Sequence, residues 1–159
     1  MSEVKQGVLS QLQEDVAARL TSSSEFSDVK IFTEKQKDIE SEIETALGSV
    51  SGGICAIVLT PKSKVAKPNL PGPYFDPIAV VVHIIENVLV NQGETGTKRP
   101  ASYLGELTAQ RLHLWSTSHH RQLICEDLSI VPNPDNLIYQ VVFRTSAGLT
   151  PENRTTQGA

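Results

Sequence analysis

The four histidines and two cysteines are the residues of this sequence best suited to metal binding or to nucleophilic chemistry. Zinc sites are usually built on short paired spacings such as HExxH or CxxC, and neither spacing occurs. His119 and His120 are adjacent, so their side chains point in different directions. We interpret them as polar residues at the C-terminus of a helix, where partial positive charge suits the helix dipole, and we expect no metal.

Both cysteines, Cys55 and Cys125, lie in strongly apolar stretches of predicted strand. We expect buried free thiols with raised pKa values, and one disulfide between them is the alternative. No GxSxG elbow is present to activate a serine. His83 could meet an acid such as Glu86 or Asp127, but a hydrogen-bonded histidine on a sheet face is the simpler interpretation.

The sequence also lacks phosphate-binding glycine loops and paired catalytic carboxylates with the required spacing. Neither GxGxxG nor GxxxxGK[ST] occurs, and the nearest stretch, residues 93–98, does not place its lysine as a phosphate loop requires. The carboxylates Glu40, Glu42 and Glu44 are best explained as the solvated face of a helix. We therefore expect no catalytic residue, no cofactor and no enzyme activity.

The composition fits one globular domain. A chain of 159 residues with 39% hydrophobic and 20% charged residues can fold without disulfides. A net charge of −4 argues against a dedicated nucleic-acid-binding protein. The N-terminus lacks the apolar core of a signal peptide, and the apolar stretch 78–90 is too short to span a bilayer as a helix. We expect a soluble protein made in the cytoplasm, with a domain over 1–147 and a polar tail over 148–159.

Hydrophobic periodicity predicts three helices and five strands. Ser2 and Ser102 are the expected caps of the first and third helices, and Gly48 is the expected end of the second. The third strand is too long for a domain of this size, so we expect a bend, a bulge or a projecting end, with Pro77 at its start. The helices are expected at 3–21, at 37–47 and after Ser102, and the strands at 28–33, 54–60, 77–91, 121–131 and 136–146.

The order α-β-α-β-β-α-β-β predicts an α+β fold with a mixed, mostly antiparallel sheet flanked by about three helices. Strands 54–60 and 77–91 are joined without a helix, so they should pair antiparallel, and the last two strands should form a hairpin. Segments 61–76 and 92–102 should be long irregular loops, which in compact domains are usually functional or mobile.

Basic residues gather in these two loops and suggest a local positive patch. Lys62, Lys64 and Lys67 lie in the first loop, and Lys98 and Arg99 lie in the second. Ordinary solubilising charge is the simpler interpretation. The alternative is contact with passing nucleic acid, which would be salt-sensitive and blind to sequence, or with an acidic neighbouring subunit.

The order of elements over residues 3–147 resembles the tail terminator proteins of tailed bacteriophages. That group includes the minor tail protein U family and the small tail-completion proteins of contractile tails. The segments that carry the resemblance are the helix VLSQLQEDVAARL, the strands GICAIVLTP and DPIAVVVHIIENVLVN, and the closing hairpin that ends in LIYQVVFRTSAGL. The resemblance implies a virion protein that forms a ring, usually of six subunits, at the head-proximal end of the tail. Such a ring stops tail-tube polymerisation and gives the head or neck connector a docking surface, without catalysis or a cofactor.

A closed ring needs heterologous interfaces, for which strand edges and long loops are suitable. We therefore take as candidate subunit or partner contacts Lys62, Lys64, Lys67, Tyr74, Phe75, Glu86, Lys98 and Arg99. The expected partners are copies of the chain, tail tube protein and a connector or neck protein, with DNA passing through the lumen and no membrane. Two alternatives stay open: another neck, head-completion or baseplate adaptor protein, and a small ligand-binding domain. The second alternative needs segment 61–76 to cover a pocket near His83 or Trp115.

Overall fold

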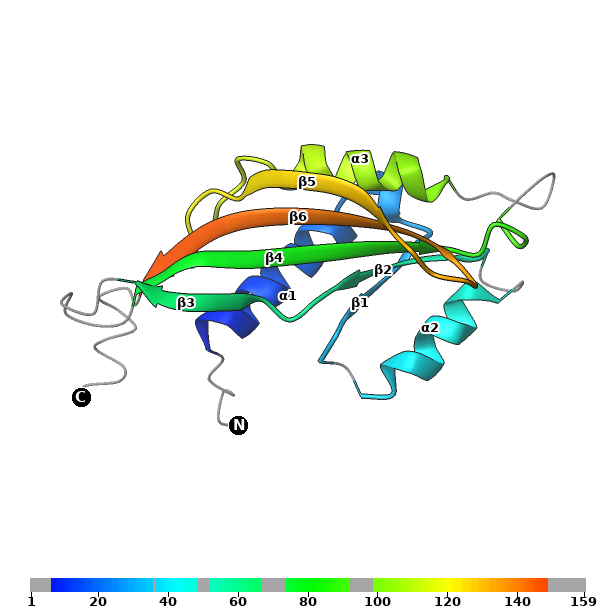
Figure 1. The fold of residues 1–159 in the computed structure, drawn as a ribbon, viewed down its shortest axis with the longest axis horizontal. Helices are drawn as coiled ribbons and strands as arrows, with labels where there is room; N and C mark the ends of the chain where they lie inside the picture. The colour runs from blue at the N-terminus through cyan, green and yellow to red at the C-terminus, as the bar shows by residue number, and fades with distance from the viewer. Residues whose placement is uncertain (1–6, 36, 49–51, 67–73, 92–98, 149–159) are drawn as a thin grey trace.

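A computed structural model describes residues 7–35, 37–48, 52–66, 74–91 and 99–148 of the chain. Within these residues three α-helices pack on one six-stranded sheet, which confirms the predicted α+β class (Figure 1). No helix in this part of the chain is long and apolar enough to cross a membrane. The elements are α1 (Val8–Thr21), the short 3-10 helix η1 (Ser24–Phe26), β1 (Lys30–Thr33), α2 (Ile39–Leu47), β2 (Ile54–Val58), β3 (Lys62–Ala66), β4 (Tyr74–Glu86), α3 (Ala101–Leu112), β5 (Ile124–Val131) and β6 (Leu137–Gly148).

The sheet has the strand order β1-β2-β4-β6-β5, and β3 also pairs with β4. Only β1 and β2 are parallel, so the sheet is mixed and mostly antiparallel as predicted. β2 pairs with the second half of β4, from Val82 to Glu86, and β3 pairs with its first half, from Tyr74 to Ala79. The pairing of β2 with β4 and the β5–β6 hairpin confirm the two predicted antiparallel contacts.

The segment predicted as an irregular loop contains a strand, so that prediction was wrong for residues 62–66. Pro61 precedes β3 and does not interrupt it, which leaves the strand free to pair with β4. β4 itself begins at Tyr74, so Pro77 lies inside the strand and not at its start. The register of β4 shifts between Phe75 and Ile78, which confirms the expected bulge and places the proline where no ladder hydrogen bond is needed.

Several predicted boundaries also differ. β4 ends at Glu86 and not at residue 91. α1 begins after Gly7, and the predicted cap Ser2 lies outside the described residues. α3 begins after Pro100 without a side-chain cap, so Ser102 is not its cap. α3 ends at Leu112, so His119 and His120 follow the helix in an irregular segment and do not form its C-terminus. β6 runs to Gly148, and the rest of the predicted tail lies outside the described residues.

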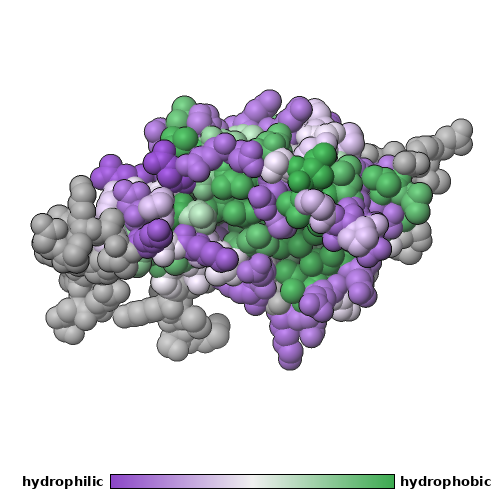
Figure 2. Space-filling model, viewed as in Figure 1, coloured by the Kyte–Doolittle hydropathy of each residue, from purple (hydrophilic) through white to green (hydrophobic). Residues whose placement is uncertain are grey.

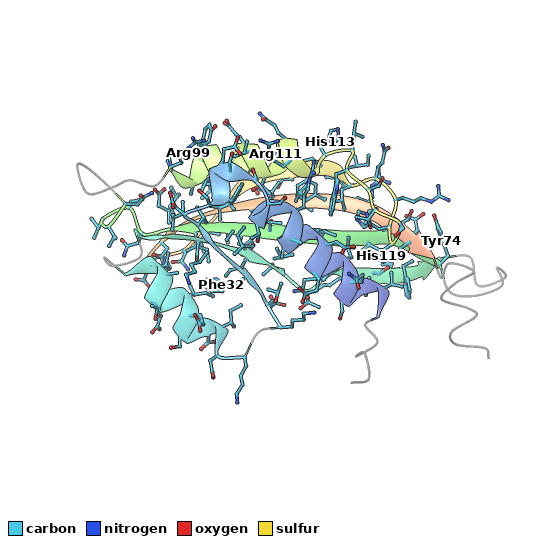
Figure 3. All side chains as sticks on the ribbon, turned by 180° about the vertical axis from the view of Figure 1, so that it is seen from behind. Phe32, Tyr74, Arg99, Arg111, His113 and His119 are labelled. Carbon is cyan, nitrogen blue, oxygen red and sulfur yellow. The ribbon has the colours of Figure 1, made fainter. Side chains whose placement is uncertain are left out.

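The alternation of β4 creates two hydrophobic cores on opposite faces of the sheet. Ile78, Val80, Val82 and Ile84 are fully buried against α1 and α3. Ile85 points to the other face, where a smaller core includes Cys55, Ile57, Phe32 and Ile138 with Ala46 and Leu47 of α2. Seen from behind, α1 crosses the face that carries the larger core (Figure 3).

Glu86 ties the end of β4 to the start of α3. Its side chain is 5% exposed. Oε1 accepts a hydrogen bond from the backbone N–H of Ala101 at 3.2 Å, and Oε2 accepts one from the side-chain amide of Asn91 at 2.6 Å. The first turn of α3 has no acidic residue of its own, so this carboxylate takes the place of a local N-cap and suits the positive end of the helix dipole.

We predict that Glu86→Ala lowers the free energy of unfolding by about 2–4 kcal/mol, because the N–H of Ala101 at the helix N-terminus loses its acceptor and Asn91 keeps only its longer bond to the carbonyl of Arg99. Urea unfolding followed by circular dichroism measures this loss. Glu106→Ala, at an exposed site on the same helix, is the matched control and should change stability by less than about 0.5 kcal/mol. Equal small losses in both variants would contradict the capping role.

Candidate functional site

The two faces of the sheet are covered unequally. α1 and α3 cover one face, whereas the only helix packed on the other face, among the described residues, is the nine-residue α2. Beyond α2 the side chains of β4 and β6 remain partly exposed. Apolar side chains gather across the middle of this face (Figure 2). We define the open face by Leu59, Ala79, Val81, His83, Gln140 and Val142.

The two polar residues within the open face form a hydrogen bond with each other. His83 and Gln140 are partners in the β4–β6 register, and the Nε2 of His83 donates to Oε1 of Gln140 at 2.9 Å. His83 bonds neither of the two acids considered as its partner, Glu86 and Asp127. Glu86 caps α3, and Asp127 accepts from the hydroxyl of Ser129 at 2.8 Å. His83 is therefore a hydrogen-bonded histidine on a sheet face, as predicted, and burying it would leave this bond intact.

Opposite charges lie at the two ends of the open face. At one end, Lys62 and Lys64 of β3 are exposed and form no ion pair with the described residues. At the other end, α2 presents exposed carboxylates that are also unpaired among the described residues: Asp38, Glu40, Glu42 and Glu44. The predicted solvated helix face is therefore confirmed. Since β3 and α2 lie at opposite ends of the molecule (Figure 1), the ends of the open face differ in the sign of their charge.

The predicted positive patch does not form among the described residues. Arg99 lies beside α3, where its guanidinium stacks on the ring of Tyr103 at 5.0 Å and Nη1 donates to the Tyr103 hydroxyl at 3.0 Å. Lys62 and Lys64 lie instead beside the start of β4, near Tyr74, and Figure 3 shows Arg99 and Tyr74 at opposite ends of the molecule. Lys67 and Lys98, the other predicted members, lie outside the described residues.

The other candidate contacts fall into different environments. The hydroxyl of Tyr74 donates to Oγ of Ser146 at 3.0 Å, and Phe75 packs against the larger core. Both side chains are half-buried near the start of β4. Glu86 is buried and both of its carboxylate oxygens bond within the chain. Glu86 is therefore not free to contact a partner, contrary to the prediction.

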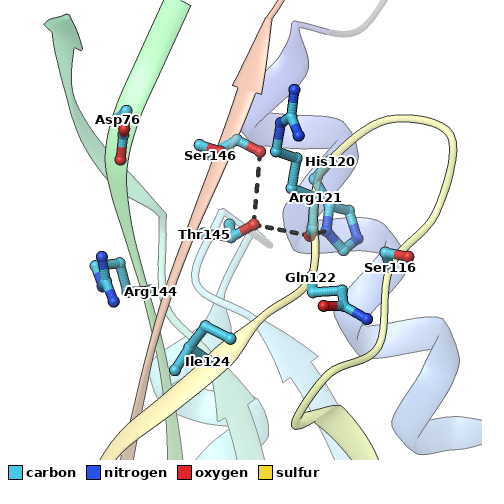
Figure 4. Close-up of a pocket in the computed structure, with 9 residues that line it drawn as sticks. All are labelled: Asp76, Ser116, His120, Arg121, Gln122, Ile124, Arg144, Thr145 and Ser146. Atoms are coloured by element: carbon cyan, nitrogen blue, oxygen red, sulfur yellow. Dashed lines mark hydrogen bonds between the residues drawn. The ribbon is translucent and has the colours of Figure 1, made fainter.

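A hollow of about 610 Å³ lies between β6, the start of β5 and the segment before it (Figure 4). Its wall includes His120, Arg121 and Arg144. The carbonyl of Arg121 accepts from Nδ1 of His120 at 2.6 Å and from the hydroxyl of Thr145 at 2.8 Å, and Arg144 bonds Glu126 at 2.6 Å. This hollow is not lined by His83 or Trp115, where a ligand pocket was predicted.

Burial shifts the pKa values of both thiols and of one histidine, His120. Cys55 and Cys125 are both free, which confirms the expectation, but Cys125 is only half-buried. Burial raises the pKa of Cys55 to about 12 and also raises the pKa of Cys125. Burial lowers the pKa of His120. Within the part of the chain that the structure describes, no group of three or more His, Cys, Asp or Glu residues could hold a metal ion.

Comparison with known proteins gives a likeness of fold. No protein-family model matches the chain, and no curated protein matches it. Among solved structures, a chain of the virion of a native gene transfer agent (GTA) particle has a TM-score of 0.62 to this chain at 13% sequence identity. The match covers 90% of this chain and 99% of that chain. The two chains therefore share one fold over nearly all of the virion protein's length.

Sequence reasoning missed Val81, Gln140 and Val142 as members of a surface. The signal was present in β6, where Gln140, Val142 and Arg144 alternate with buried residues and mix polar with apolar types. Such a mixture is typical of a half-exposed strand face. What the alternation could not show is that the nine-residue α2 covers only part of this side.

We predict that stability falls as the pH drops below about 6.5, the usual pKa of histidine. The folded protein holds the pKa of His120 below that value, so the unfolded chain binds the proton first and acid favours unfolding. One proton contributes at most about 1.4 kcal/mol per pH unit. Urea unfolding at several pH values should show a flatter profile for His120→Gln. The same slope as in the wild type would contradict this role.

We also predict that the two thiols react at different rates. At pH 8, a disulfide reagent such as Ellman's reagent should modify Cys125 well before Cys55, because Cys55 is fully buried and burial raises its pKa to about 12, whereas Cys125 is half-buried. The variants Cys55→Ala and Cys125→Ala assign the two phases. In urea the two rates should converge. Rapid modification of Cys55 in the folded protein would show that the smaller core is open.

Proposed function

We propose that this chain is a structural protein of a phage-like virion. It assembles into a six-membered ring at the head-proximal end of a tail, where it ends the tail tube and offers a docking surface to the head or neck connector. The observation that carries this proposal is the shared fold with a chain of a gene transfer agent virion, which extends over nearly the whole of that chain. The ring and its position follow the family resemblance of the sequence.

The surface of the domain supports a role in assembly. The open face carries apolar side chains that no helix of the described residues covers. The edge strand β5 also exposes Leu128 and Ile130, the second of them at 56%. Unpaired strand edges and exposed apolar side chains are typical of surfaces that bind other proteins. A closed ring uses two different surfaces of each subunit, and the α2 end and the β3 end of the open face are two such surfaces.

DNA is a passing partner in this proposal and not a bound ligand. The net charge of −4 does not favour tight binding to phosphate. Lys62 and Lys64 are exposed, so a lumen-facing position would allow weak, salt-sensitive contacts without reading sequence. The protein is made in the host cytoplasm and functions in the virion, with tail tube protein and a connector or neck protein as its neighbours.

A different place in the particle is the second candidate. A neck, head-completion or baseplate adaptor protein would rest on the same likeness, because a shared fold does not fix a position in the virion. Such a protein also needs no catalytic site. The two candidates differ in which structure the ring binds.

The test combines the purified protein with preassembled tail tubes. Native mass spectrometry should find six copies per assembly, and negative-stain images should show rings closing one end of each tube and stopping its further growth. A strict monomer that leaves tubes growing would contradict the proposal. Rings that do not bind tail tubes but bind another part of the particle would favour the second candidate.

A further inference from the structure

Among the described residues, no helix covers the open face, although it carries apolar side chains. Val81 and Val142 are direct partners in the β4–β6 register and both are only half-buried, although they lie near the middle of the sheet. Leu59 continues this apolar surface towards the α2 side. The polar residues between them, His83 and Gln140, already bond each other. That bond survives burial, and a covering surface has to pair only the amide N–H groups of Gln140 and Nδ1 of His83.

We propose that a second copy of this chain covers the open face, with α2 of one copy against β3 of the next. This contact deepens the proposed ring and depends on it. The charged residues at the two ends of the open face favour a second copy over another partner. One end of the face carries Glu40, Glu42 and Glu44, and the other end carries Lys62 and Lys64. These groups are too far apart to pair within one copy, because α2 packs on β2 and β3 lies beside the start of β4.

A partner of a single charge sign would leave one end of the face unmatched. A second copy carries both signs, so carboxylates of one copy can face the lysines of the next. Complementary charges of this kind fix the register of an interface and suppress wrong pairings. Each copy uses its α2 end against one neighbour and its β3 end against the other. The two contacting surfaces are therefore different parts of the chain, so the contact is heterologous and can propagate from copy to copy into a closed ring.

Lys62 and Lys64 also determine which kind of contact the copies can form. β3 is an edge strand, and exposed lysines on an edge strand disfavour the addition of another strand by backbone pairing. The contact is therefore made by side chains, with apolar side chains of the open face buried beside the ion pairs. Salt screens such pairs, so assembly should weaken as ionic strength rises.

The experiment is a charge swap read by native mass spectrometry and sedimentation. One variant carries Lys62→Glu and Lys64→Glu, and a second carries Glu40→Lys and Glu44→Lys. Each alone should assemble at least about tenfold more weakly than the wild type, because like charges meet at the contact. An equimolar mixture of the two should recover assemblies with alternating copies. A chain with all four changes should also recover. Glu106→Lys, on exposed α3 away from the open face, is the control and should assemble normally.

All these positions are exposed, so circular dichroism and melting temperature should match the wild type. Wild-type assembly by either charge variant, or a mixture that does not recover, overturns the contact. Normal rings that lose only tube binding would place tube protein on this face and also overturn it. A wild-type ring that fails to cap tubes contradicts the proposed function and leaves the contact in place. A wild type that stays monomeric even with tubes overturns both.

Discussion

The antiparallel pairing of β4 with β6 is the constraint on which the rest of the structure depends. It runs from Tyr74 with Gly148 to Glu86 with Leu137, and it sets which side chains of both strands point to each face. A shift of one residue would send the buried row of β4 to the wrong side of the sheet. The bulge between Phe75 and Ile78 lets β4 contain a proline without losing this register.

This register divides the apolar residues into two unequal cores. The larger core receives two helices and is sealed, whereas the smaller core receives only α2 and ends where that helix ends. The open face is the direct result, since β4 and β6 extend further than the helix can cover. The same strands also position the charges, because β3 continues along the edge of β4 beyond β2. A surface for a partner thus follows from the length of two strands.

The sequence predicted the class of the fold and both antiparallel contacts of the central strands, because β-branched runs and the turn before β6 are local signals. It did not predict β3, since Lys62–Ala66 is a short polar strand stabilised by its neighbour β4. It placed Ser102 as the cap of α3, but the acceptor at the helix start is Glu86, which lies 15 residues before Ala101. Long-range contacts of this kind leave no local pattern. The predicted contact residues lie in different parts of the structure for the same reason. Arg99, for example, lies far from Lys62 and Lys64.

The central claim is that the open face is covered when copies assemble. Hydroxyl-radical footprinting of the unmodified protein tests it, because the reagent labels exposed side chains in both the isolated and the assembled forms. The account predicts that labelling of Leu59, Val81 and Val142 falls on assembly, while labelling of the exposed Leu114, outside the open face, stays constant. Unchanged labelling of Leu59, Val81 and Val142 in assembled rings would contradict the account.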